Sequence, residues 1–108
     1  MKREISTDRI VQFLVGLLGT PSPSGYHQEA IGYVEQAFGV LDLPGLHMAR
    51  NTKGALIATL DGATATAPRA LSAHIDTLGA MVREVKPNGR LLMTQLGGYA
   101  WNAVEGEN

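Results

Sequence analysis

Apolar residues recur at helical spacing in two stretches near the start of the chain, separated by a segment of turn residues. The first pattern follows a Ser-Thr pair that can cap a helix, and it predicts a helix over Thr7–Leu18. The second predicts a helix that starts within residues 24–26 and ends before Gly39. Residues 20–25 hold two prolines and a glycine, so we interpret them as a stiff connector, with a functional role as the alternative.

The rest of the chain carries shorter apolar runs bounded by turn residues, which is the pattern of β-strands. Strands are predicted over Leu46–Arg50 and residues 55–60, with an Asn-Thr-Lys-Gly turn between them. Another is predicted over residues 69–76, where nearly continuous small and apolar residues favour a strand covered on both faces, as inside a parallel sheet. An Asn-Gly pair between residues 81–85 and Leu91–Leu96 predicts an antiparallel hairpin.

The order of these elements predicts an α/β fold. Two helices and three strands come first, and the pattern is purely β from about Leu78 onward. We therefore expect a domain boundary there, with residues 1–78 in an α/β domain and residues 79–108 at the start of a β-domain. At 108 residues, of which 44% are hydrophobic, the chain has the size of a single domain and can bury only a modest core.

Composition excludes several classes of function. Nine Lys and Arg against ten Asp and Glu give a formal charge of −1, and no basic stripe is present, which argues against a nucleic-acid partner. There are no cysteines, so a metal would need His and carboxylate ligands. The longest apolar run near the N-terminus, residues 13–18, is far below the roughly 20 residues of a membrane span. We expect no signal peptide, no membrane contact and a cytoplasmic location.

Candidate chemistry is concentrated in residues 70–82, where an apolar run carries His74 and Asp76. In extended backbone these two side chains project to the same side while Ile75 faces the other way. We expect both groups to be buried at a strand end, where sites form in open α/β sheets and where imidazole and carboxylate need a partner. The partner indicated is a metal ion bound by His74, with Asp76 orienting the ring.

The alternative for His74 is a core histidine that a backbone carbonyl satisfies, and the His-x-Asp spacing alone does not separate the two interpretations. His27 and His47 are the other histidines, and we expect both to be exposed polar residues without a ligand role.

Several motifs, taken in their order along the chain, resemble the M42 family of metallo-aminopeptidases, of the glutamyl or tetrahedral aminopeptidase type. The resemblance covers essentially the whole chain, and its most specific part is the His-x-Asp strand with the Gly and Met-Val pattern that follows. The motifs are residues 18–25 (LGTPSPSG), Lys53-Gly54, residues 72–82 (SAHIDTLGAMV), Asn88-Gly89 and Gly97-Gly98.

The resemblance implies the N-terminal part of a mixed α/β metallopeptidase catalytic domain that runs into an inserted antiparallel β-barrel or PDZ-like domain. It implies two divalent metal ions per complete subunit, zinc or cobalt, with His74 as a metal ligand and Asp76 as the catalytic residue that orients it. It also implies a cytoplasmic hydrolase that removes N-terminal residues from peptides and assembles into dimers and dodecamers.

The bridging aspartate, the general-base glutamate and the other metal ligands of the family all lie beyond Asn108. We therefore expect this chain to be the N-terminal portion of a longer enzyme and to be inactive alone, because a hydrolytic zinc site needs about three protein ligands. The alternative is a non-catalytic α/β interaction or assembly fragment whose unclosed strands recruit copies of itself or a partner.

Overall fold

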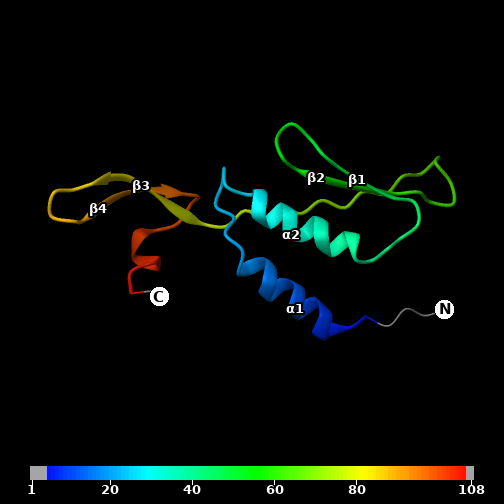
Figure 1. The fold of residues 1–108 in the computed structure, drawn as a ribbon, viewed down its shortest axis with the longest axis horizontal. Coiled ribbons are helices and arrows are strands. Elements are labelled where there is room, and N and C mark those ends of the chain that lie inside the picture. The colour runs from blue at the N-terminus through cyan, green and yellow to red at the C-terminus, as the bar shows by residue number, and fades with distance from the viewer. Residues whose placement is uncertain (1–4, 107–108) are drawn as a thin grey trace.

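The computed structural model describes residues 5–106 and has α/β content, as predicted. The strands form two separate antiparallel sheets of two strands each, one from β1 and β2 and one from β3 and β4. In chain order the elements are α1 (Thr7–Leu18), α2 (Gln28–Gly39), β1 (Leu46–Arg50), β2 (Leu56–Leu60), β3 (Gly79–Val85), β4 (Leu91–Leu96) and the short 3₁₀ helix η1 (Trp101–Ala103) (Figure 1).

The two helices lie side by side and contact each other through aromatic residues (Figure 1). The Phe13 and Tyr33 rings are 5.5 Å apart between centroids, and the Tyr33 hydroxyl donates to the Phe13 carbonyl at 3.2 Å. Gly16 allows this approach, because a Cβ at that position would lie 2.1 Å from the Tyr33 hydroxyl oxygen. The predicted bounds of α1 are confirmed, and the Ser6 hydroxyl caps the helix.

Helix α2 begins later than predicted, at Gln28. A turn precedes it, in which the Tyr26 N–H donates to the Pro23 carbonyl at 2.8 Å. Gly25 has a φ of +90°, which is incompatible with a helix and is readily adopted by glycine alone. The predicted start within residues 24–26 was therefore too early because a glycine turn occupies those positions.

The two strands predicted on either side of the Asn-Thr-Lys-Gly turn pair as an antiparallel hairpin, and the predicted hairpin over residues 81–96 also forms. In the first, Leu46 pairs with Leu60 and Arg50 pairs with Leu56. Its turn is closed by the Asn51 side chain, whose oxygen accepts from two backbone N–H groups in the turn. In the second, the predicted Asn-Gly turn is present, with Gly89 at a φ of +79°.

The predicted strand over residues 69–76 does not form, and this part of the fold prediction was wrong. The backbone there is not paired into a sheet, and the nearest pairing is an isolated parallel bridge between Pro23 and Thr77. A strand needs neighbouring backbone to pair with its N–H and C=O groups. The nearest such hydrogen bond is at Thr77, whose N–H donates to the Ser22 carbonyl at 2.8 Å. Among residues 5–106 there is no parallel sheet, β-barrel or PDZ-like fold.

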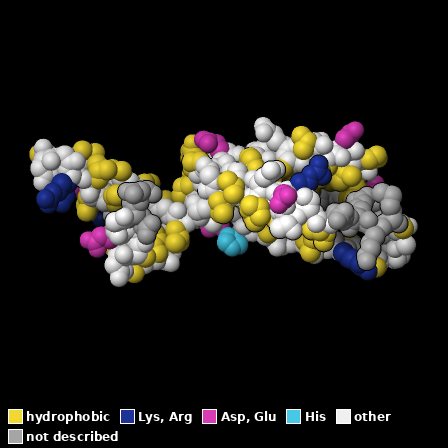
Figure 2. Space-filling model, turned by 90° about the horizontal axis from the view of Figure 1, so that it is seen from below, with side chains coloured by type: hydrophobic (Ala, Val, Ile, Leu, Met, Phe, Trp, Pro, Cys, Tyr) yellow, Lys and Arg dark blue, Asp and Glu magenta, His cyan; other side chains and the backbone are white. Residues whose placement is uncertain are grey.

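Few side chains are buried within the described residues. The buried residues are the apolar Ala30 and Ile31 of α2 and the polar Ser22, which is 1% exposed. The Cα radius of gyration is 18.8 Å, whereas a compact domain of this length has about 13 Å. Figure 2 shows hydrophobic side chains spread over the visible face, and Figure 1 shows β3 and β4 at one end, away from the helices. Much apolar surface is thus available for contact with other parts of a protein.

Candidate functional site

His74 and Asp76 lie in the extended segment that leads into β3. The His74 Nδ1 atom is 2.8 Å from the Asp76 Oδ1 atom, which is hydrogen-bonding distance. Ile75 is half-buried, whereas its two neighbours are exposed. The predicted alternation, which brings the imidazole and the carboxylate together on one side of the backbone, is therefore confirmed.

The predicted burial of this pair was wrong. The His74 side chain is 87% exposed and the Asp76 side chain is 53% exposed. The expectation assumed a sheet with covering layers on both faces, and no such sheet forms over these positions in residues 5–106. Within residues 5–106 the His74 ring bonds a carboxylate rather than a backbone carbonyl, and it is accessible to a ligand.

The protonation of the pair follows from the carboxylate. The hydrogen bond with His74 holds the pKa of Asp76 below its ordinary value of 3.8, so Asp76 is ionised at neutral pH. An ionised carboxylate can only accept, and His74 Nδ1 therefore carries the hydrogen and donates it. In the neutral ring the lone pair then lies on Nε2, which is the form in which imidazole binds a metal.

A third side chain contacts the pair from the first connector of the chain. The Ser24 hydroxyl donates to the second carboxylate oxygen, Asp76 Oδ2, at 3.4 Å. Ser24 follows Pro23, which pairs with Thr77 in the parallel bridge, so the connector runs alongside the end of the His74 segment. The sequence predicted a stiff connector here, with a functional role as the alternative, and did not predict the contact with Asp76. The only signal for that contact was the stiff Pro-Ser-Gly composition.

The other two histidines lie elsewhere. His47 is exposed on β1, as predicted. His27 precedes α2 and is half-buried rather than exposed, because its ring packs against the turn at Gly54, where a Cβ would lie 2.3 Å from Nε2. Within residues 5–106, no group of three or more His, Cys, Asp or Glu side chains is placed to hold a metal ion.

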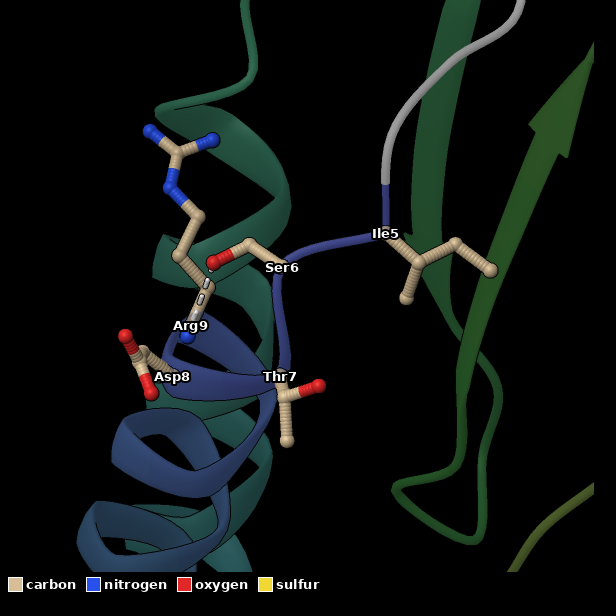
Figure 3. A pocket seen from close by; sticks show the side chains of 5 residues that line it. All are labelled: Ile5, Ser6, Thr7, Asp8 and Arg9. Carbon is tan, nitrogen blue, oxygen red and sulfur yellow. Dashed lines mark hydrogen bonds between the residues drawn. The ribbon is translucent and has the colours of Figure 1, made fainter.

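Two surface hollows of the described residues are lined by side chains other than His74. One lies at the start of α1, where the Ser6 side chain caps the helix, and is lined by Ile5, Ser6, Thr7, Asp8 and Arg9 (Figure 3). The other lies between the start of α2 and the β1–β2 turn. The candidate site is therefore the exposed His74–Asp76 pair itself.

Among the described residues, no helix is long and apolar enough to cross a membrane.

The residues present fit part of a metal centre. A histidine whose Nδ1 donates to a carboxylate and whose Nε2 is exposed is the standard arrangement of a metal-ligating imidazole. A hydrolytic zinc site uses about three protein ligands. Within the described residues, His74 and Asp76 are one imidazole of this kind and one carboxylate hydrogen-bonded to it.

Comparison with known proteins identifies the family of the chain. The model of the M42 glutamyl aminopeptidase family matches residues 54–108, a range that includes His74 and Asp76. A protein of Bacillus subtilis (strain 168) named "Putative aminopeptidase YhfE" is 42% identical to the chain over 102 residues, or 94% of the chain. The chain spans 29% of the length of that relative. The chain belongs to the M42 glutamyl aminopeptidase family, which confirms the resemblance drawn from its motifs.

Proposed function

We propose that the chain is the N-terminal part of the catalytic subunit of a metal-dependent aminopeptidase that hydrolyses N-terminal residues from peptides. Its family and the name of its Bacillus subtilis relative support a peptidase. The observation that carries the metal-dependent part of the proposal is the exposed His74 ring, whose Nδ1 is held by Asp76 at 2.8 Å.

In this proposal His74 and Asp76 have distinct roles. His74 offers its neutral Nε2 as a metal ligand. Asp76 accepts the Nδ1 hydrogen, which fixes the tautomer, holds the plane of the ring and makes Nε2 a stronger donor. Neither residue takes a proton from the substrate.

The complete subunit would hold two divalent ions, zinc or cobalt, and His74 would contribute to one of the two positions. When bound, such ions polarise the scissile carbonyl and activate water near neutral pH. The remaining ligands and the general base would come from the rest of the complete protein, since the described residues hold no group of three or more candidate metal ligands.

We place the complete protein in the cytoplasm and propose that it assembles into homo-oligomers, from dimers up to dodecamers, through a β-domain that begins at residue 79. That division, with residues 1–78 in the catalytic domain, stays a prediction. Exposed apolar side chains on the second hairpin support an assembly role; they are Met81, Val82, Val85, Leu91, Leu92 and Met93.

The same exposed hairpin supports the competing proposal, a non-catalytic interaction or assembly fragment. Metal content separates the two, because an assembly fragment has no need of a divalent ion at His74.

The test uses the complete protein and a peptide with a free N-terminus. His74→Ala is expected to lower hydrolysis by more than about 100-fold, because loss of a ligand exceeds the 10–100-fold effect typical of an orienting group. His47→Ala is the matched control, since His47 is exposed on β1, and it should retain wild-type activity. Wild-type hydrolysis by His74→Ala would refute the proposed function, and acetylation of the peptide N-terminus should stop the reaction if the enzyme is an aminopeptidase.

A further inference from the structure

We infer that Ser24 is a positioning residue for His74 and acts through Asp76, an inference that rests on the proposed function. Ser24 lies 52 residues before Asp76 in the sequence, and the contact between them joins the first connector to the candidate site.

The carboxylate of Asp76 is engaged at both oxygens. Oδ1 contacts His74 Nδ1 at 2.8 Å, and Oδ2 accepts from the Ser24 hydroxyl at 3.4 Å. The terminal torsion of an aspartate has a broad distribution, so a single hydrogen bond leaves the carboxylate free to rotate. A second bond on the opposite oxygen restricts that rotation and so restricts the plane of the imidazole that Oδ1 holds.

Ser24 is itself placed by backbone contacts. The Ser22 carbonyl accepts from the Thr77 N–H at 2.8 Å, and Pro23 pairs with Thr77 in a parallel bridge. On the other side, the Tyr26 N–H donates to the Pro23 carbonyl at 2.8 Å and closes the turn that contains Ser24. The hydroxyl therefore comes from a segment whose backbone is tied directly to the residue after Asp76.

The exposure of Ser24 separates this role from a structural one. Its side chain is exposed, and the hydrogen bond to Asp76 is the contact that its hydroxyl makes within residues 5–106. Truncating an exposed hydroxyl leaves no cavity and no unsatisfied buried group, so a purely structural role predicts almost no effect. A positioning role predicts weaker metal binding, because partners outside the ligand shell commonly change metal affinity.

The experiment measures zinc affinity of the complete protein by competition with a chromophoric chelator. The relevant site is the one that His74→Ala removes. Ser24→Ala should weaken zinc binding at that site by about 3–10-fold, since Ser24 is one contact further from the metal than a typical orienting group with its 10–100-fold effect. Ser24→Thr keeps the hydroxyl and should remain within about twofold of wild type, on the same basis.

Ser22→Ala is the matched control in the same connector. The Ser22 hydroxyl has no hydrogen-bond partner among the described residues, and its backbone carbonyl is kept in the variant. We expect wild-type zinc affinity. Weakening equal to that of Ser24→Ala would show that the connector acts through its stability and would overturn the inference.

A double-mutant cycle tests the route through Asp76. If Ser24 acts only by holding that carboxylate, Ser24→Ala should add nothing to Asp76→Asn. Independent, additive losses would overturn this route, as would wild-type zinc affinity in Ser24→Ala. Failure of the proposed function would give a different result from failure of this inference. In that case His74→Ala and Asp76→Asn would both bind zinc as the wild type does.

Discussion

At the scale of single residues, the site depends on a carboxylate that determines the state of its neighbouring imidazole. Asp76 is ionised at neutral pH, and the hydrogen bond with His74 favours that charged form further by lowering the pKa of Asp76 below 3.8. That charge fixes the hydrogen on Nδ1 and leaves the lone pair on Nε2, the atom to which the proposed function assigns the metal. Asp76 therefore determines the form of His74 that is available to a metal.

This arrangement predicts how Asp76 titrates. His74→Ala removes the bond that favours the carboxylate, so the pKa of Asp76 should rise toward 3.8, and carbon-13 NMR of the carboxyl group measures the change. Because the folded-state pKa is lowered, the stabilisation from the pair is present above 3.8 and is lost as pH falls through the folded-state value. His47→Ala should leave the titration unchanged, and an unchanged midpoint in His74→Ala would contradict this account.

The contact between His74 and Asp76 was predictable from sequence, because it depends only on the period-two alternation of extended backbone. Their exposure was not, because burial depends on which elements cover them. The Ser24 contact was not predictable either, since it joins residues 52 positions apart and depends on the path of a connector.

At the scale of elements, local signals determined most boundaries. The cap and apolar spacing of α1 and the Asn-Gly turn of the second hairpin act within a few residues, and both were predicted correctly. The predictions failed where an element depends on pairing with residues that are distant in the sequence. Residues 69–76 have strand-like composition, but the described chain provides one parallel bridge at Thr77 and no neighbouring strand.

The contact between α1 and α2 predicts the effect of a single methyl group. A Cβ at Gly16 would lie 2.1 Å from the Tyr33 hydroxyl oxygen, so Gly16→Ala should push Tyr33 away and break its bond to the Phe13 carbonyl. We expect a loss of about 1–3 kcal/mol in the free energy of unfolding, as for other overpacked contacts. Urea or thermal unfolding, followed by circular dichroism, measures it.

Gly39→Ala is the control for this prediction, because it makes the same change in a helix where a Cβ would meet nothing within 4 Å. It should keep or raise stability, by up to about 1 kcal/mol, through the higher helix propensity of alanine. Equal stability of the Gly16 and Gly39 variants would show that the helix contact contributes little.

At the scale of the whole molecule, the chain leaves much apolar surface exposed and has few buried residues. Helix α1 alone exposes Ile10, Val11, Leu14, Val15 and Leu18. The radius of gyration of 18.8 Å exceeds the value of about 13 Å for a compact domain. These features agree with a chain that spans 29% of its Bacillus subtilis relative and whose faces would be covered in a larger protein.

The chain alone should therefore lack aminopeptidase activity, even with added zinc or cobalt. Its described residues hold no group of three or more candidate metal ligands, whereas hydrolysis at a zinc centre needs about three protein ligands. A fluorogenic aminopeptidase assay, with the complete protein as the positive control, measures this. Metal-dependent turnover by the 108-residue chain would contradict the prediction.

We propose that His74 binds a metal in the complete enzyme, and the number of metal ions bound per subunit tests this claim. Native mass spectrometry of the complete protein should show two divalent ions per subunit, as in two-metal hydrolytic sites, and His74→Ala should lose at least one of them. A wild-type protein without divalent metal, or a His74→Ala variant that keeps the full wild-type complement, would contradict the claim.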